Sequence, residues 1–177
     1  VTAGSLSDVS RSVGGNYACA GEHTWRFAKH GDDLVATNIA DDIQAFDLRS
    51  GSLFAKHVTS TLEPKAKYIA TIGEFLVVAN TNEGGTFYPN RVRWPSIDDN
   101  SDFDRTDTNQ ADHQDILDTG VITGLAGEKE YGVVITENGL HRMDYVGGDL
   151  IFTFDKIEGS VGSQVSESVV SHRKDTF

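Results

Sequence analysis

A short pattern that occurs three times constrains the fold of this chain more than any other feature. In its clearest copy, an apolar run at 67–72 is followed by Gly73 and by a second apolar run that ends at Asn80. Both runs are rich in Ile, Val, Tyr and Phe, which favour β-strands, and Gly adopts the positive φ of a tight turn without steric cost. The pattern therefore predicts a β-hairpin.

The same frame occurs earlier and later in the chain. Residues 25–38 align with residues 67–80 without a gap when Gly31 is placed opposite Gly73. A third copy at 121–136 has a turn that is longer by about two residues. Three hairpins in one frame indicate a structural repeat.

Each hairpin is followed by further strand-like segments, so that one repeat holds about four strands in roughly 40 residues, the size of a propeller blade. A single twisted sheet cannot bury both of its faces, and successive sheets should stack and share a core. We therefore predict an all-β fold, a β-propeller-like stack of antiparallel four-stranded sheets. The expected divisions are an irregular segment 1–24, blade-like repeats at 25–58, 59–120 and 121–160, and the start of a further repeat at 161–177.

Several local features are expected from turn and apolar residues. A short strand is expected near Tyr17. The polar cluster 81–85 is expected to turn the chain into a short strand at 91–94, which Pro95 limits. The polar stretch 98–119 is expected to be a long acidic loop, and such loops on compact domains are usually functional or mobile.

Charge and cysteine content restrict the class of protein. The 177 residues include 27 acidic and 15 basic ones, a formal net charge of −12, which disfavours the cationic surface of an ordinary nucleic-acid-binding protein. Cys19 is the only cysteine, which excludes an intrachain disulfide and is expected to be a small buried apolar residue. No apolar run approaches transmembrane length, so we expect no membrane insertion. Three repeats are fewer than the roughly four to eight blades of a closed propeller. We therefore expect a longer polypeptide or a partner to complete the stack.

The acidic loop suggests a calcium site, because Asp98, Asn100 and Asp102 have the spacing of the first EF-hand ligands. The sixth position of that motif is Phe103 instead of Gly, and the twelfth is Asn109 instead of Glu. We therefore expect no metal, and a solvated loop in which Phe103 packs back onto its blade. His113 is expected to be an exposed loop histidine.

Motifs of catalysis are missing from the sequence, which contains no nucleophile elbow, P-loop or HExxH pair. We expect no catalytic residues and no cofactor. Carboxylate pairs for glycoside hydrolysis converge only in three dimensions, so that a glycan-directed function stays open. Trp25 and Trp94 are expected in blade cores, with their indole N–H groups hydrogen-bonded.

Three arginines flank aromatic residues in the expected strands. In so acidic a chain, ion pairs within or between subunits are favoured over contacts with DNA phosphates. Together with the acidic loop, they form the set of candidate interface residues: Asp98, Asp99, Asp102, Phe103, Asp104, Arg91, Arg93 and Arg142.

A series of segments resembles a known group of viral proteins. The series comprises Trp25-Arg26-Phe27-Ala28 with Gly31, Leu34-Val35-Ala36, Ile43-Gln44, Phe46-Asp47, Pro89-Asn90-Arg91-Val92-Arg93-Trp94 with Ile97, Asp99, Asp102 and Phe103, Gln110-Ala111-Asp112, Gln114-Asp115, Glu137-Asn138-Gly139-Leu140 with Arg142-Met143, Tyr145-Val146-Gly147, Ile151-Phe152 and Phe154. It resembles β-propeller virion proteins of tailed bacteriophages and prophages, which are related to the packaged-DNA stabilisation (tail hub or nozzle) proteins of short-tailed phages. The resemblance covers most of residues 8–177 and rests on scattered apolar and turn positions, and the chains of that group are usually much longer.

The resemblance implies a structural virion component of the tail or neck and not an enzyme. Identical subunits would form a ring, expected to be a hexamer, that contacts other tail proteins or the portal and adaptor. Genomic DNA would pass through this ring during ejection without sequence-specific binding, and the protein would help to retain or conduct it. The expected location is the virion, and the host cytoplasm during assembly. The alternatives are a propeller module that binds or hydrolyses glycans and a free-standing interaction module.

Overall fold

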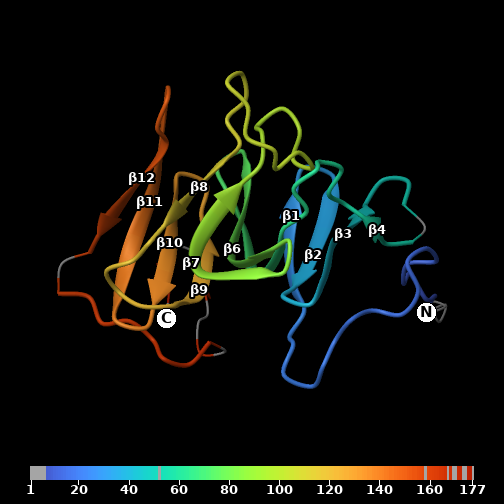
Figure 1. Cartoon of the computed structure of the whole chain (residues 1–177), viewed down its shortest axis with the longest axis horizontal. Coiled ribbons are helices and arrows are strands. Elements are labelled where there is room, and N and C mark those ends of the chain that lie inside the picture. The colour runs from blue at the N-terminus through green and yellow to red at the C-terminus, as the bar shows by residue number, and fades with distance from the viewer. Residues whose placement is uncertain are drawn as a thin grey trace, which may run out of the picture.

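The chain forms a stack of antiparallel β-sheets (Figure 1). The structure, a computed structural model, describes residues 7–51, 53–157, 159–166, 168, 171–172 and 175–176. Within these residues there is no helix, and three four-stranded sheets follow one another, each with its strands in sequence order. No sheet closes on itself. The predicted all-β fold class is therefore confirmed as an incomplete propeller-like stack.

The first three sheets contain twelve strands. Sheet 1 consists of β1 (Arg26–His30), β2 (Asp33–Asn38), β3 (Asp41–Asp47) and β4 (Ala55–Lys56). Sheet 2 consists of β5 (Lys65–Ile72), β6 (Phe75–Glu83), β7 (Thr86–Trp94) and β8 (Asp112–Asp115). Sheet 3 consists of β9 (Ile122–Gly127), β10 (Tyr131–Thr136), β11 (Gly139–Gly147) and β12 (Ile151–Lys156).

A small fourth sheet pairs β13 (Ser171–His172) with β14 (Asp175–Thr176). These strands fall in the range where the start of a further repeat was expected. The rest of that expectation depends in part on residues 169–170 and 173–174, which lie outside the described residues, as do residues 1–6 of the N-terminal segment.

The three hairpins adopt the turns that the repeat predicts. In sheets 1 and 2 the loop between the first two strands begins at Gly31 and Gly73, with φ of 56° and 59°. In sheet 3 the last residue pair before the turn is Gly127 and Gly132, so that this loop is two residues longer. The local turn geometry thus follows the spacing of the apolar runs.

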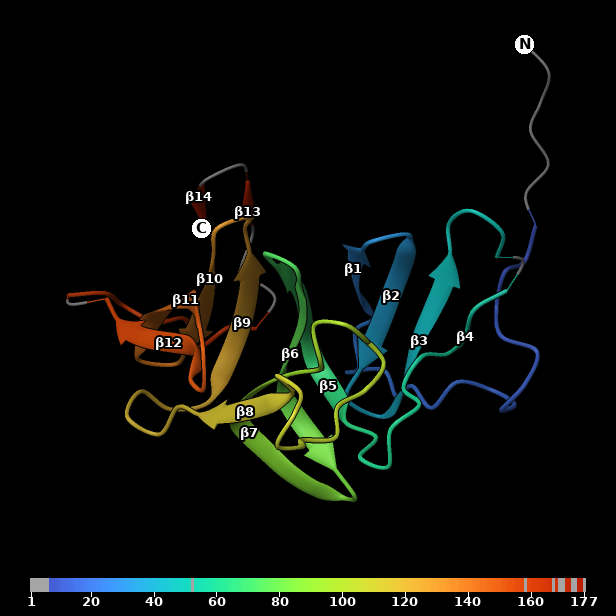
Figure 2. The ribbon, with the colours of Figure 1, turned by 90° about the horizontal axis from the view of Figure 1, so that it is seen from above.

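Sheet 2 lies between the other two sheets (Figures 1 and 2), and the first strands β1, β5 and β9 are neighbours. Both faces of β6 are buried: Leu76 and Val78 pack toward sheet 1, while Phe75 and Val77 pack toward sheet 3. A strand with two buried faces has no polar side, which is why this segment is a continuous apolar run. Two inter-sheet cores hold the stack together.

The second half of sheet 2 differs from the expectation. The polar cluster at 81–85 is not a turn as a whole, because β6 continues to Glu83 and only Gly84 and Gly85 turn the chain. The following strand begins at Thr86 and is nine residues long. This twisted extension of β6 and β7 reaches beyond the apolar core and is held by backbone pairing and by the ion pairs described below. The polarity of its residues alone does not indicate a strand.

Two further expectations are wrong. The stretch 98–119 is not a loop throughout, since β8 is the fourth strand of sheet 2 and pairs with β7. No strand occurs near Tyr17, because the described part of the N-terminal segment crosses sheet 1 with irregular backbone. In both cases, whether a segment forms a strand depends on whether a strand that is distant in sequence lies beside it.

Sheets 2 and 3 approach each other closely at β5 and β9. A Cβ atom on Gly127 would lie 2.1 Å from the carbonyl oxygen of Thr71. Gly127→Ala is therefore expected to overpack this contact and to lower the free energy of unfolding by about 1–3 kcal/mol. Urea unfolding measures the change. Gly21→Ala is the matched control, because nothing lies within 4 Å of a Cβ there; equal losses in the two variants would contradict the close approach.

Candidate functional site

A cluster of buried charges crosses the face of sheet 2 that points toward sheet 1. Glu83 accepts hydrogen bonds from Arg93 Nε at 2.9 Å and from Arg91 Nη1 at 3.0 Å. Arg91 also forms two parallel bonds to Asp115, at 2.7 and 2.9 Å. The side chains of Glu83, Arg91 and Arg93 are only 7%, 11% and 6% exposed. We call Glu83, Arg91, Arg93 and Asp115 the ion-pair cluster.

The cluster fixes its own charge states. Burial by itself would raise the pKa of Glu83, but the hydrogen bonds and charges of Arg93 and Arg91 lower it overall. The hydrogen bond to Asp115 is the main reason that the pKa of Arg91 is raised. The expectation that these arginines form ion pairs is confirmed, within the chain. Arg93 is buried and Arg91 nearly so, and neither is placed as a surface contact.

The acidic loop packs back onto its own chain. Phe103 is fully buried in the core between sheets 1 and 2, as expected, and therefore cannot serve as an interface residue. The carboxylate of Asp104 accepts hydrogen bonds from the amides of Thr61 and Leu62 at 2.8 and 2.7 Å, which lower its pKa. Figure 2 shows the loop after β7 reaching toward the segment that joins sheets 1 and 2.

The residues with the EF-hand spacing make contacts within the chain. Asn100 lies between two histidines, and Asp102 accepts the amide of Asp104 at 3.0 Å. In the ranges that the structure describes, no group of three or more His, Cys, Asp or Glu residues is placed to hold a metal ion. Asp98 and Asp99 are exposed, and Asp102 is half-buried.

Arg142 lies apart from the other candidates, on the outer face of sheet 3. It donates to the carboxylate of Asp144 at 2.7 Å and lies 4.4 Å from the ring centroid of Tyr131. The Arg142 side chain is 50% exposed. The structure therefore places the eight candidate interface residues in two separate regions. Arg93 and Phe103 are buried, and the other six are half-buried or exposed.

Two histidines connect the acidic loop to sheets 1 and 2. His57 Nε2 donates to the carbonyl of Asn100 at 3.1 Å. His30 accepts the side-chain amide of Asn100 at 2.8 Å and donates to the carbonyl of Glu74 at 2.9 Å. Burial is the main reason that the pKa of His57 is lowered. Burial therefore favours the neutral imidazole, although the hydrogen bond to Asn100 acts in the opposite direction.

The free energy of unfolding is expected to fall when the pH drops below about 6.5, the ordinary pKa of a histidine. The fold lowers the pKa of His57, so the unfolded chain binds a proton more readily. The contribution of His57 to the stability of the fold is present above that pH. It is lost as the pH falls through the lowered pKa of His57. Urea midpoints at about pH 7.5 and about pH 5.5 measure the loss. His57→Gln keeps a side-chain donor and should show a smaller loss; an unchanged loss would exclude His57 as a main cause.

His141 is the histidine that most resembles part of a catalytic group. Its Nε2 lies 2.8 Å from Thr119 Oγ1, and burial lowers its pKa. Asp118 faces the same ring nitrogen at 3.6 Å. In a triad the acid would orient the ring from the opposite nitrogen. Thr119 is also only 1% exposed, so we assign this group a structural role. His113, expected in a loop, lies on β8 and is half-buried.

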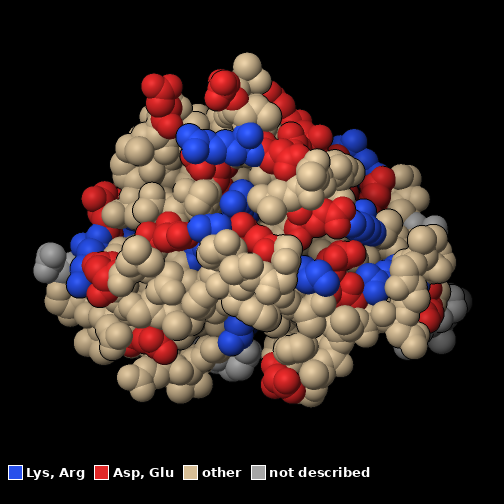
Figure 3. Space-filling model, in the orientation of Figure 1, with Lys and Arg blue, Asp and Glu red and all other residues tan. Residues whose placement is uncertain are grey.

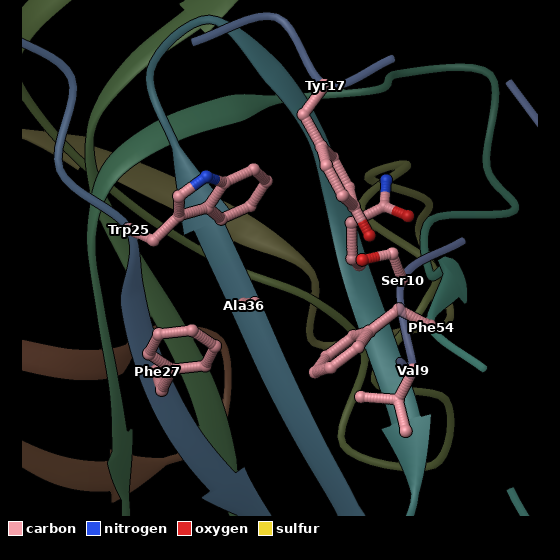
Figure 4. A pocket seen from close by; sticks show the side chains of 8 residues that line it. Val9, Ser10, Tyr17, Trp25, Phe27, Ala36 and Phe54 are labelled. Carbon is pink, nitrogen blue, oxygen red and sulfur yellow. The ribbon is translucent and has the colours of Figure 1, made fainter. Parts of the chain in front are cut away.

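An apolar cavity lies on the outer face of sheet 1 (Figure 4). It has a volume of about 180 Å³. Trp25 and Phe27 form one wall, Phe54 and the N-terminal segment form the opposite wall, and Ala36 lies on the strand between them. We call this cavity, with its lining residues Val9, Ser10, Tyr17, Trp25, Phe27, Ala36, Gln44 and Phe54, the slot.

An ion pair holds the N-terminal wall of the slot in place. Arg11 forms two hydrogen bonds of 2.9 Å to the buried carboxylate of Asp41, and its guanidinium lies 4.5 Å from the ring centroid of Tyr17. Burial would raise the pKa of Asp41, but the bonds from Arg11 and from the Ala18 amide lower it overall. The ion pair therefore ties this wall to β3 of sheet 1.

The sequence analysis did not predict the slot, and its expectations for Trp25 and Cys19 were wrong. Trp94 is buried and donates to the Gln110 carbonyl at 2.7 Å, as expected for a blade-core tryptophan. Trp25, in contrast, is half-buried at the slot. Cys19 is exposed and not buried. The available signal was the alternation of residues from Trp25 into β1, which favours placing Trp25 and Phe27 on one face.

Comparison with protein-family models finds no match to this chain, and comparison with curated proteins finds none either. Among the described residues, no helix is suited to span a membrane.

Proposed function

We propose that this chain is a structural building block of a tailed-phage virion, part of a ring in the tail or neck around the DNA channel. The observation that carries the proposal is the stack itself. Three sheets share two continuous cores, and loop and linker residues such as Phe103 fill the space between sheets 1 and 2. Such an arrangement resists deformation, because packed interiors have few voids and low compressibility. A rigid wall is what a DNA-conducting ring requires.

The charge distribution supports the same function. Arg91 and Arg93 are paired inside the chain. On the face seen in Figure 3, acidic and basic side chains lie beside one another and form no large basic patch. The chain as a whole has a net charge of −12. DNA phosphates gain little from such a surface, so the genome would pass along it without lasting contacts.

The proposal can be tested on phage particles that are purified from cells whose genome encodes this chain. We expect the chain to remain with particles purified by density gradient, and an in-frame deletion to give particles that lack a complete tail or lose their packaged DNA. Expression of the chain from a plasmid should restore them. A chain that is absent from purified particles would contradict the proposal. If the chain is absent from particles and binds oligosaccharides in solution, the glycan-directed alternative is favoured. The observation that supports this alternative is the pair of aromatic side chains, Trp25 and Phe27, at the slot.

A further inference from the structure

The outer face of sheet 1 corresponds to a face that is buried in sheet 2. In the repeat alignment Phe27 takes the place of Ile69, and Ala36 takes the place of Val78. Ile69 and Val78 are 6% and 0% exposed, because they pack toward sheet 1. Phe27 is 56% exposed. The face that a preceding sheet would cover is therefore open at the slot.

The slot has the dimensions of a side-chain receptor. Its volume of about 180 Å³ is below the range of about 300–1,000 Å³ typical of pockets for drug-sized ligands. Its walls are mostly aromatic, from Tyr17, Trp25, Phe27 and Phe54. One or two aliphatic side chains from another chain would fill it, as Phe103 fills the space between sheets 1 and 2.

The opposite end of the stack presents aliphatic side chains on a strained turn. We call residues 145–150, which comprise the end of β11 and the turn into β12, the tip. Val146 and Leu150 are 52% and 63% exposed. Directly after them, Ile151 has a φ of 57°, and the amide of Phe152 donates to the carbonyl of Leu150 at 2.6 Å. A positive φ at a β-branched residue is strained. Strain of this kind often marks a functional segment, and here it shapes the turn that carries Leu150.

One exposed charged residue on the face of the slot and one in the tip have opposite signs. Lys29 follows Phe27 by two residues on β1, so it lies on the same face of the sheet, and it is exposed. Asp149 precedes Leu150 in the tip and is also exposed. Copies with a net charge of −12 repel one another, so an ammonium group at the slot would favour approach of this carboxylate.

We propose that the tip of one copy of this chain inserts into the slot of a second copy, with Val146 and Leu150 against the aromatic walls and Asp149 near Lys29. Sheets 1 and 3 lie at opposite ends of the stack (Figure 1), so the contact is head-to-tail. Such an interface builds a ring if the rotation between copies closes. The proposal rests on the ring assembly proposed above, and it names the surfaces that join neighbouring subunits.

Two variants with complementary defects test the contact. Phe27→Glu places a charge in the slot, and Leu150→Glu places one on the tip; both positions are exposed in the single chain. In sedimentation velocity, the wild-type chain should self-associate, and each variant alone should associate about tenfold more weakly or less. A mixture should form dimers and nothing larger, because each variant keeps one intact half of the contact.

Controls separate the contact from unfolding and from general hydrophobicity. Leu117→Glu changes an apolar residue that is 80% exposed and lies outside both surfaces, so it should leave association unchanged. Lys29→Glu and Asp149→Lys should each weaken association, and the double variant should restore it. Circular dichroism confirms that each variant has the wild-type fold.

Some outcomes would overturn the inference. A wild-type chain that stays monomeric at about millimolar concentration would do so, as would variants that associate like the wild type or a mixture without dimers. If the chain is nevertheless found in purified particles, the proposed function stands and only this contact is wrong. If the chain is absent from particles, the proposed function fails even when the tip binds the slot.

Discussion

Replacing Glu83 with Ala is expected to lower the free energy of unfolding by about 3–5 kcal/mol, because it leaves two buried guanidinium groups without their shared carboxylate. Glu83 is the only residue of the ion-pair cluster that accepts hydrogen bonds from both Arg91 and Arg93. Such a loss is a large share of the roughly 5–15 kcal/mol that stabilises a typical domain. Urea unfolding followed by tryptophan fluorescence measures it.

Asp144→Ala is the matched control for this prediction. Asp144 also accepts from an arginine, but the Arg142 side chain is 50% exposed, and such surface pairs contribute only about 0–1 kcal/mol. If Glu83→Ala does not fold, Glu83→Gln keeps the shape and one acceptor oxygen and should fold with a smaller loss. Equal stability of Glu83→Ala and Asp144→Ala would show that the cluster is not buried as described.

Phe103→Ala is expected to cost about 3–5 kcal/mol, the usual range for removing a fully buried aromatic side chain. Phe103 is 0% exposed and belongs to the core between sheets 1 and 2. Its loss should also release the acidic loop from the segment at 57–62, since the amides of Thr61 and Leu62 bond to the neighbouring Asp104. Chemical denaturation measures the first effect, and hydrogen exchange of these two amides measures the second.

A phenylalanine at the surface provides the comparison. Phe87 is 63% exposed, so Phe87→Ala should change stability by no more than about 0.5 kcal/mol and should leave exchange at Thr61 and Leu62 unchanged. If Phe103→Ala left both stability and exchange as in the wild type, Phe103 would not anchor the acidic loop to the rest of the chain.

The two predictions concern Phe103 and the ion-pair partner of Arg91 and Arg93, three residues that were candidates for an interface. The acidic loop and the paired arginines looked like surface features because they are polar and lie outside the apolar runs. In the structure, Phe103 fills the space between sheets 1 and 2, and the arginines are paired on sheet 2 with Glu83 and Asp115. The surfaces that we propose for a partner are instead the slot and the tip, whose residues appeared in the sequence as ordinary strand and turn positions.

The sequence by itself determined what depends on neighbours along the chain. Hairpin positions follow from Gly31 and Gly73, because a turn with positive φ is a local requirement. The central place of sheet 2 is reflected in the continuous apolar run of β6, since a strand buried on both faces has no polar side. Fold class and repeat frame are therefore readable from local patterns.

Only the tertiary structure decided which charged and aromatic residues are buried. Glu83 and Arg93 are ten positions apart and meet because β6 and β7 pair beyond the core, while Phe103 enters a core whose other residues come from two sheets. Phe27 and Ile69 occupy equivalent places in the repeat, yet one is exposed and the other is covered by a neighbouring sheet. Burial of this kind depends on which sheet stacks against which, and no local pattern carries that information.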